Sequence, residues 1–372
     1  MTTQFKYKSL DECLLLIKNG ANIKQAKDAG GIPITRIETL SGGLFNRDRL
    51  GYAGIEDIGK YESFVLEEGD LLFSHINSKA YIGRTVLYRN LNKEVIIHGM
   101  NLLRIKVNPQ ILLPSFLYYT SLTDSFKEQV ASSRKDAVNQ SSISVSDIKK
   151  IVIPVPTLEE QQRIVDELDL LSGIVDKKNA QLRDLDALAQ SIFYEMFGDP
   201  KNNDLHWQTS LFGDTFKLKS GDGLKEKEFI FGNYPVYGGN GISGYHNCFN
   251  KEGKHVIIGR VGAYCGNVRY VQDCFWLTDN AFDALFDSTR LDYTFVCWML
   301  NTLDLHRFAN HAAQPVISNS GLRQLSVIIP PIEIQRHFAE RASAIQSQKN
   351  FILASLKDSE FLLNSRMSHY FD

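Results

Sequence analysis

Two sets of polar and aromatic side chains have the types that contact nucleic acids, and both lie near segments rich in glycine and asparagine. Arginine and lysine donate hydrogen bonds to phosphate or guanine, and asparagine forms paired hydrogen bonds with adenine. We predict DNA contacts from Arg36, Arg47, Arg49, Asn77, Lys79 and Arg84 in the first set, and from Lys219, Lys225, Tyr237, Asn240, Tyr245, Arg260 and Asn267 in the second. For each arginine and lysine, a solvated surface role is the alternative.

The run Gly238–Gly241 is the densest group of glycines near the second set. Glycine has no side chain, so such a run would let the backbone approach a phosphate closely. A tight turn is the alternative interpretation of the same run.

Motifs that carry catalysis are incomplete in this sequence. Asn108-Pro109-Gln110 lacks the second proline and the aromatic residue that an adenine methyltransferase places around the amino group. The segment Gly54–Lys60 imitates a phosphate-binding loop, but Tyr61 stands where a serine or threonine would hold Mg²⁺. The nine histidines show no metal-ligand spacing. We therefore expect no catalytic residue, no metal site and no cofactor in this chain.

A segment that occurs twice must position these residues. With an offset of 174 positions, Gln140–Gly198 aligns with Gln314–Asp372 without a gap. Identical residues at this offset include the pairs Pro156/Pro330, Gln161/Gln335 and Phe197/Phe371. A repeat at a fixed offset indicates a duplicated architecture.

Each copy of the repeat has the pattern of a long helix. From Ile164 to Met196, apolar residues recur in steps of four and three, with Lys178 the only polar residue in the seam. This heptad spacing requires a partner helix to bury the apolar stripe. Thr157 is a suitable N-cap, and Gly198 is expected to end the helix. In the second copy, the seam also contains four polar residues, Lys349, Ser359, Arg366 and Tyr370. We expect them either to weaken the pairing or to serve the docking of a partner.

Two helices of about 40 residues would each be about 60 Å long, and equal lengths favour an antiparallel pair. The alternative is two amphipathic helices, each packed on its own domain. A rod of this length would span roughly 17 base pairs, which suits two major-groove contacts on one face of a duplex.

The segments before the two helices also resemble each other. Gly69–Phe73 precedes Ala80-Tyr81-Ile82-Gly83, as Gly253–Ile257 precedes Ala263-Tyr264-Cys265-Gly266. We therefore predict an α+β fold: two pseudo-twofold-related α/β domains joined by two long helices that form an antiparallel coiled coil. The predicted parts are residues 1–152, a first recognition domain; 153–198, the central helix; 199–329, a second recognition domain; and 330–372, the C-terminal helix.

Local patterns predict the elements inside the two domains. We expect helices at Leu10–Lys18, Pro114–Val130 and Asp292–Phe308, and strands at Ile32–Ile37, Leu71–Ile76, Tyr81–Tyr88, Val95–His98, Leu102–Val107, His255–Arg260, Val268–Val271 and Phe275–Leu277.

Composition is that of an ordinary globular protein, with 43% hydrophobic and 23% charged residues and a net charge of −2. Residues 1–150 carry a net charge of +4 and residues 151–198 one of −5, so the central helix is not a nucleic-acid surface. No signal peptide or 18-residue apolar run is present in the sequence, and we expect a cytoplasmic protein.

The sequence resembles the specificity subunit of type I restriction–modification systems. The residues that carry the resemblance are Ile151–Gln161 and its echo Ile328–Gln335, together with Gly31–Ile37, Tyr234–Gly241 and Ile258–Tyr264. The match covers essentially the whole chain and includes the order of its parts.

The resemblance implies a non-catalytic, DNA-binding subunit. Each globular domain would be a target-recognition domain for one half of an asymmetric, interrupted DNA site, and the helices would set the gap between the halves. Its partners would be double-stranded DNA, two methylation subunits that modify adenine with S-adenosylmethionine, and restriction subunits that use ATP and Mg²⁺. The alternative is a coiled-coil scaffold whose two heads bind proteins rather than DNA.

Overall fold

The computed structural model describes residues 5–24, 30–138, 140–310 and 314–371, so the predicted ends at Met1 and Asp372 lie outside the described residues. The chain forms two compact units: unit 1 consists of residues 1–177 and 356–372, and unit 2 of residues 178–355. The two long helices, α5 (Leu158–Phe197) and α9 (Ile332–Phe371), each give one end to each unit. The predicted α+β class with its pair of long helices is confirmed, whereas the predicted domain boundaries stay a prediction.

Unit 1 is built around an antiparallel sheet with the strand order β2-β8-β5-β7. Its elements before α5 are β1 (Lys6–Ser9), α1 (Leu10–Cys13), β2 (Leu14–Asn19), β3 (Pro33–Ile34), β4 (Gly51–Tyr52), β5 (Leu71–Ser74), β6 (Ile76–Asn77), β7 (Thr85–Leu87), β8 (Leu102–Val107), α2 (Pro114–Leu122), α3 (Asp124–Ser133), β9 (Lys135–Asp136), β10 (Ser141–Ser142), α4 (Val145–Lys149) and β11 (Val152–Val155). Three 3₁₀ segments, Ile37–Gly43, Arg47–Arg49 and Gly59–Phe64, fill the long excursion between β2 and β5.

Unit 2 repeats the sheet with the order β13-β20-β17-β18. Its elements are β12 (Thr209–Leu211), α6 (Phe212–Thr215), β13 (Lys217–Ser220), β14 (Tyr234–Gly238), β15 (Gly241–His246), β16 (Lys251–Glu252), β17 (His255–Gly259), β18 (Val268–Val271), β19 (Cys274–Leu277), β20 (Ala281–Leu285), α7 (Tyr293–Thr302), α8 (Asn319–Leu322) and β21 (Ser326–Ile328), with 3₁₀ segments at Glu226–Glu228 and Leu305–Phe308. A second sheet, β15-β14-β19-β16, is specific to this unit.

Several predicted elements are wrong in extent. The helix predicted at Leu10–Lys18 ends at Cys13, and the next residues form β2, which pairs with β8 from Leu14↔Val107 to Asn19↔Leu103. Tertiary pairing overrides the local helical pattern here, because an apolar run such as Leu14–Ile17 fits either periodicity. The strand predicted at Tyr81–Tyr88 is reduced to β7, because Gly83 has a φ of 82° and turns the chain before it.

Caps explain why two predicted helices are shorter than expected. The helix predicted at Pro114–Val130 is divided at Thr123, whose extended backbone ends α2 and whose hydroxyl accepts a hydrogen bond from Phe126 N at 3.2 Å to begin α3. The helix predicted at Asp292–Phe308 ends at Thr302, and Asp304 follows with a φ of 54°. The strand predicted at Val95–His98 forms isolated bridges only.

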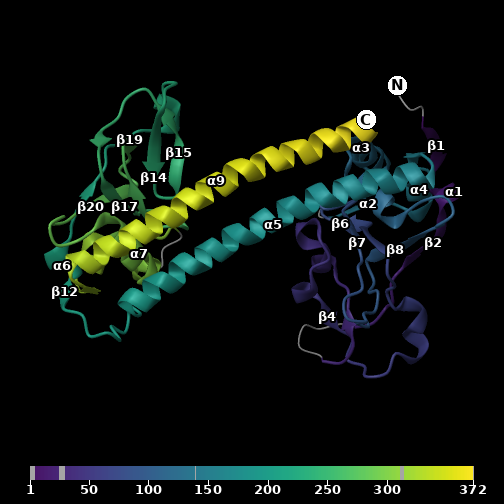
Figure 1. Cartoon of the computed structure of the whole chain (residues 1–372), viewed down its shortest axis with the longest axis horizontal. Coiled ribbons are helices and arrows are strands. Elements are labelled where there is room, and N and C mark those ends of the chain that lie inside the picture. The colour runs from purple at the N-terminus through teal and green to yellow at the C-terminus, as the bar shows by residue number, and fades with distance from the viewer. Residues whose placement is uncertain (1–4, 25–29, 139, 311–313, 372) are drawn as a thin grey trace. The chain divides into compact units, whose positions relative to one another are not determined.

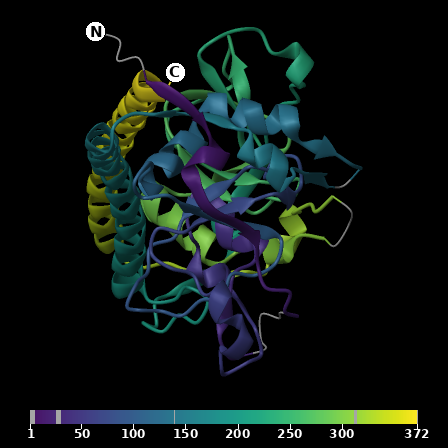
Figure 2. The same cartoon turned by 90° about the vertical axis from the view of Figure 1, so that its right-hand side faces the viewer.

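Within each unit the two long helices lie side by side and run antiparallel (Figure 1 and Figure 2). In unit 1, Arg163 and Glu167 of α5 contact Tyr370 and Arg366 of α9, respectively. In unit 2, Lys178 donates to Ser355 O at 2.8 Å. Residue numbers therefore rise along one helix and fall along the other, as the sequence predicted.

The ends of α5 also follow the prediction. Thr157 Oγ1 accepts a hydrogen bond from Glu160 N at 3.3 Å, as an N-cap does. At the other end, Gly198 has a φ of 70° and its N–H donates to Tyr194 O at 2.9 Å, the left-handed cap that glycine favours.

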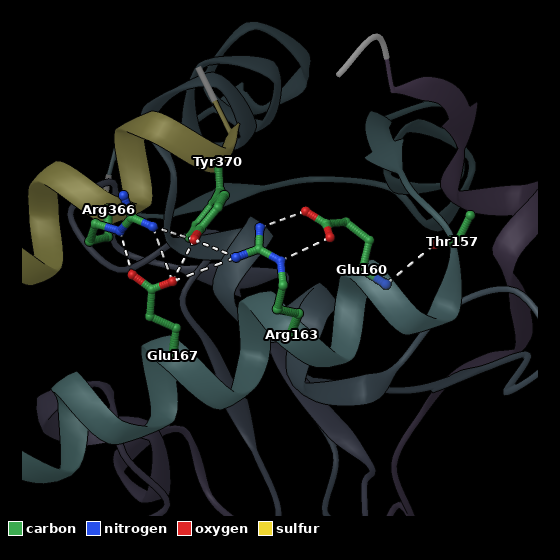
Figure 3. A network of polar contacts seen from close by, with 6 residues as sticks. All are labelled: Thr157, Glu160, Arg163, Glu167, Arg366 and Tyr370. Atoms are coloured by element: carbon green, nitrogen blue, oxygen red, sulfur yellow. Dashed lines mark hydrogen bonds and ion pairs between the residues drawn. The ribbon is translucent and has the colours of Figure 1, made fainter. Parts of the chain in front are cut away.

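The polar seam residues of α9 have partners instead of loosening the pair. Figure 3 shows Glu167 in contact with Arg366 and with the hydroxyl of Tyr370, which also accepts from Arg163 Nη1 at 3.3 Å. The Arg366 guanidinium and the Tyr370 hydroxyl hold the pKa of Glu167 below its ordinary value. In unit 2, Lys349 forms an ion pair with Asp186. The predicted weakening is thus offset by polar pairing across the seam.

A buried glutamine attaches the start of each helix to its unit. In unit 1, Gln161 Nε2 donates to Ile111 O at 2.9 Å and to Pro156 O at 3.0 Å, and its Oε1 accepts from Leu113 N at 2.8 Å. The side chain is fully buried. One residue therefore connects the helix, the proline segment before it and the loop that leads into α2.

Gln335 makes the same three bonds in unit 2. Its Nε2 donates to Arg290 O at 3.0 Å and to Pro330 O at 2.7 Å, and its Oε1 accepts from Asp292 N at 2.8 Å. In each unit the glutamine bonds the proline five residues before it and two loop residues that are themselves two positions apart. The junction is therefore duplicated as well as the helices.

The far end of the partner helix completes each core. In unit 1 the ring of Phe371, from α9, lies 5.3 Å from that of Phe116, from α2. In unit 2 the ring of Phe197, from α5, lies 4.7 Å from that of Phe295, from α7. Burial of one such ring contributes on the order of 2–3 kcal/mol. Each unit therefore requires both long helices.

A candidate nucleic-acid interface in each unit

Four predicted contact residues of unit 1 line one cavity of about 770 Å³. Arg36 and Arg49 come from the excursion between β3 and β4, Asn77 from β6, and Arg84 from the turn before β7. The wall is completed by Ile23, Ile37, Glu38, Leu40, Ser41, Gly42, Ser74, Tyr81, Met100 and Asn101. The sequence could select these side chains by type, and the fold brings them together.

Each of these four side chains is held differently. Arg36 Nη2 lies 3.3 Å from Glu38 Oε1, which neutralises part of its charge. Arg49 is exposed. Asn77 Nδ2 donates to Ser74 Oγ at 3.1 Å, and its Oδ1 accepts from Ser78 N at 2.8 Å. The cavity thus presents three guanidinium groups against one carboxylate, a balance that favours an anionic ligand.

The guanidinium of Arg84 is fixed on two sides. Its Nη1 donates to Leu40 O at 3.2 Å, and its plane lies over the ring of Tyr81, 4.6 Å from the centroid. Tyr81 itself is 47% exposed. Arg84 therefore reaches the cavity as a preorganised fork instead of a mobile side chain.

Arg47 and Lys79 lie outside this cavity. Arg47 forms a two-pronged ion pair with Glu94 and also donates to Arg89 O at 2.7 Å. Its contact with Glu94 raises the pKa of Arg47, and Glu94 also accepts from the hydroxyl of Tyr88. Lys79 Nζ lies 3.6 Å from Asp136 Oδ2 and is exposed. Arg47 thus has a structural role in unit 1.

Two predicted contact residues of unit 2, Lys225 and Asn240, line a cavity of about 1080 Å³. Lys225 belongs to an exposed segment with alternating charge, Lys225–Glu228, and Asn240 to the turn between β14 and β15. The far wall contains Val261, Thr278, Asp279, Asn280 and Gln314. This cavity is polar but nearly balanced in charge.

The glycines beside Asn240 allow close packing of backbone against backbone. A Cβ on Gly239 would lie 2.3 Å from Val261 O, and one on Gly259 would lie 2.2 Å from Gly239 O. Glycine is required here because the hairpin of β14 and β15 packs backbone to backbone against the end of β17. The alternative of a tight turn is confirmed, and the close approach of a phosphate to this run stays a prediction.

The other predicted residues of unit 2 are spread over its surface. Lys219, Tyr245 and Asn267 are exposed. Tyr237 packs edge-on against Phe275, with ring centroids 5.4 Å apart, and burial raises its pKa. Tyr237 is partly buried and packs against the core of unit 2.

Arg260 is partly buried. Its Nη1 donates to Asp279 O at 3.5 Å, and its guanidinium lies over the ring of Phe282, 5.2 Å from the centroid. Its Nε is buried without a hydrogen-bond partner among the described residues.

Sequence reasoning missed Arg269. This exposed side chain on β18 donates from Nη2 to Asn240 O at 3.2 Å and lies against Gly241, so it supports the wall of the cavity. Arg269 lies in the strand predicted at Val268–Val271, where it alternates with the buried Val268. That alternation was the signal that could have found it.

Within the described part of the chain, no group of three or more histidine, cysteine, aspartate or glutamate side chains is placed to hold a metal ion. A search of the same residues finds no helix with the length and apolar character needed to cross a membrane.

Known proteins share both the sequence pattern and this fold. The model of the type I restriction modification DNA specificity domain matches residues 4–184 and 205–358. A protein of Methanocaldococcus jannaschii, whose name describes a type I restriction enzyme specificity subunit, is 28% identical over 92% of this chain and 86% of its own length. The EcoprrI specificity subunit of Escherichia coli is 28% identical over 53% of each chain. A type I restriction–modification S subunit from M. genitalium has the same fold, with a TM-score of 0.68, 16% identity, and coverage of 100% of this chain and 98% of its own. The chain belongs to the family of type I restriction modification DNA specificity domains.

Proposed function

We propose that this chain is the DNA-recognition subunit of a type I restriction–modification system, in which each unit reads one half of an asymmetric, interrupted target. The observation that carries the proposal is the contrast between a duplicated frame and different cavities. The sheet order and the buried glutamine junction are the same in both units, whereas the residues that line the two cavities differ. Different linings on one frame suit two different DNA sequences.

The chemistry of each cavity supports contact with a duplex. In unit 1, Arg36, Arg49 and Arg84 provide donors for guanine or phosphate, and Asn77 provides an amide for adenine. In unit 2, Lys225 and Asn240 play these parts, with Lys219, Tyr245, Arg260 and Asn267 as further candidate contacts. Because phosphate contacts supply much of the affinity, binding is expected to weaken steeply as the salt concentration rises.

The reactions belong to partner subunits in this proposal. Two methylation subunits would modify adenine with S-adenosylmethionine, and restriction subunits would act with ATP and Mg²⁺. The antiparallel pair of α5 and α9 would set the length of the spacer between the two half-sites. The chain itself would contribute sequence recognition only.

A base-modification map of the source genome, with this gene intact and deleted, is the direct test. The expected result is that methyladenine at one interrupted, asymmetric motif disappears on deletion and returns when the gene is supplied again. An unchanged map from cells that express the methylation subunit contradicts the proposal.

Two designed chains then separate the roles of units and helices. Replacing residues 1–150 with the matching part of another family member should change one half-site and leave the other intact. Removing one heptad from α5 within residues 169–183, together with the facing heptad of α9, should shorten the tolerated spacer and leave both half-sites intact. A changed half-site in the second variant would count against the spacer role.

A further inference from the structure

A similar turn joins two adjacent strands of each sheet, β5 and β7 in unit 1 and β17 and β18 in unit 2. In unit 1 it is Ala80-Tyr81-Ile82-Gly83, and in unit 2 it is Ala263-Tyr264-Cys265-Gly266. Gly83 and Gly266 have φ values of 82° and 93°, a region that glycine adopts without strain. Each turn leads into an outer strand, β7 or β18.

Three backbone hydrogen bonds show that the two turns are equivalent. Gly83 N donates to Ser74 O at 2.8 Å, and Gly266 N donates to Gly259 O at 2.8 Å. In the reverse direction, Ser74 N donates to Arg84 O at 2.9 Å, and Gly259 N donates to Asn267 O at 2.9 Å. These bonds match at both ends of the turn, although the stretch from Ser74 to Gly83 is two residues longer than that from Gly259 to Gly266.

The third bond fixes the residue after the glycine. Arg84 N donates to Tyr81 O at 3.4 Å, and Asn267 N donates to Tyr264 O at 3.3 Å. Arg84 and Asn267 therefore occupy the same backbone position of the two units. The tyrosine beside them is shared and exposed in both, by 47% at Tyr81 and 58% at Tyr264.

The residue types at this matched position are those that distinguish purines. Arginine donates two hydrogen bonds to O6 and N7 of guanine, and asparagine exchanges two with N6 and N7 of adenine. On a shared frame, residues that are identical in both units can maintain the fold, and residues that differ can give each unit its own sequence preference.

We infer that Arg84 and Asn267 are corresponding specificity residues: Arg84 contacts a guanine in the half-site of unit 1, and Asn267 contacts an adenine in that of unit 2. This inference rests on the proposed function, in which each unit reads one half-site.

The surroundings of both side chains leave their base-reading edges free. In the part of the chain that the structure describes, the hydrogen bond of the Arg84 guanidinium goes from Nη1 to Leu40 O, and its face is held by Tyr81. Nε and Nη2 have no partner among those residues. Asn267 is exposed, and its side-chain amide makes no hydrogen bond to a described residue. Arg84 is thus preorganised, and Asn267 is open to solvent.

The test exchanges the two residues in the full-length chain. The variants Arg84→Asn and Asn267→Arg are expressed with the methylation partner in cells that lack the gene, and the modified motif is mapped. Affinity of each purified complex is then measured on duplexes in which every base pair of the wild-type motif is substituted in turn. We expect each variant to change its preference at one base pair, by about 5- to 150-fold, in the half-site of its own unit.

Matched controls separate base reading from folding and from charge. Arg84→Lys keeps the charge but loses the planar fork, so it should weaken the guanine preference while overall affinity changes little. Asn247→Arg adds the same charge at another exposed asparagine of unit 2 and should leave the motif unchanged. If Arg84→Asn unfolds in a thermal melt, Asn267→Arg still decides the question, because its position is exposed.

The possible results distinguish a failure of this inference from a failure of the proposed function. The inference is overturned if the wild-type chain directs methylation and both exchange variants keep the wild-type base preferences. The proposed function would then remain intact. A change at a base pair of the other half-site also overturns the inference. A wild-type chain that directs no methylation removes the proposed function, and the inference falls with it.

Discussion

The two units place opposite charges at one buried position of the same sheet. In unit 1, Arg104 of β8 faces Leu72 and lies 3.5 Å from the carboxylate of Asp70. In unit 2, Asp283 of β20 faces Ile257, the matching partner, and lies 3.1 Å from His255. The acidic residue thus stands just before β5 in unit 1 and on β20 in unit 2, and its basic partner stands on β8 in unit 1 and on β17 in unit 2.

This difference shows that the shared sheet requires a buried pair of opposite charges at this place, and that either residue type can stand on a given strand. Arg104, Asp70 and Asp283 are all nearly fully buried, and a buried charge persists where a partner of opposite charge compensates it. Asp283 also receives a hydrogen bond from Lys251 Nζ at 2.8 Å, which ties the second sheet of unit 2 to the first. In each unit the buried charge is therefore compensated, but by different residues.

The largest expected effect comes from breaking the pair in unit 1. Arg104→Met should lower the free energy of unfolding of unit 1 by about 3–5 kcal/mol, because it leaves Asp70 buried without its cation. The matched control is Arg89→Met, which removes an exposed ion pair with Glu68 and should cost less than about 1 kcal/mol. Denaturant dependence of hydrogen exchange in β5 and β8 measures both. Equal costs would contradict the buried-pair explanation.

The glutamine junctions test whether the units are energetically equivalent. Gln161→Ala and Gln335→Ala each leave buried backbone groups unpaired, at a cost of about 2–3 kcal/mol to the unit concerned. Hydrogen exchange that assigns the loss to one unit in each variant is the measurement. Gln162→Ala, at an exposed neighbouring position, serves as the control and should be nearly neutral. A large cost in one unit alone would break the equivalence.

The helix seam gives a smaller contrast. Unit 1 joins α5 and α9 through Glu167, Arg366 and Tyr370, whereas the positions of the latter two in the other repeat are Ile192 and Met196, which pack on the core of unit 2. Tyr370→Phe should therefore destabilise unit 1 by about 1 kcal/mol and leave unit 2 unchanged. Thermal melts at low and high salt should also show a salt-dependent loss that is confined to unit 1.

The smallest expected effect is a loss of stability in unit 2 as the pH rises above 6.5. The hydrogen bond to Asp283 raises the pKa of His255 above its ordinary 6.5. A raised histidine pKa contributes stability that is complete below pH 6.5 and is lost as the pH rises through the folded-state pKa. Between those limits unit 2 should lose stability. Unfolding of wild type and His255→Gln across this range measures it, and a variant with the wild-type slope would exclude His255.

Much of the fold followed from spacing alone. The offset of 174 residues predicted two helices of equal length, and the capping residues Thr157 and Gly198 predicted the ends of the first. Long-range pairing escaped prediction: Leu14–Asn19 has a pattern that fits a helix, and only its pairing with β8 makes it a strand. Local patterns reflect local conformational preferences. Where such a preference conflicts with long-range strand pairing, the pairing determines the structure.

The candidate site was predictable by residue type but not by geometry. Arg36, Arg49, Asn77 and Arg84 were chosen as side chains that suit DNA, and the fold brings them to one cavity. Arg47 had the same signature, yet Glu94, far from it in sequence, occupies its guanidinium. No pattern along the chain distinguishes an arginine that is available for a ligand from one that already has a partner.

The core of unit 1 has a consequence for how the protein is made. That core includes Phe371 and Tyr370, the end of α9, whereas unit 2 is a single continuous segment, residues 178–355. A ribosome that adds about 5–20 residues per second reaches Phe371 about 10–40 s after it has passed Lys177. Unit 2 can therefore complete its core during synthesis. Unit 1, the first part to leave the ribosome, keeps the groove beside Phe116 open until the last turn of α9 arrives, so it is the part most dependent on protection by chaperones.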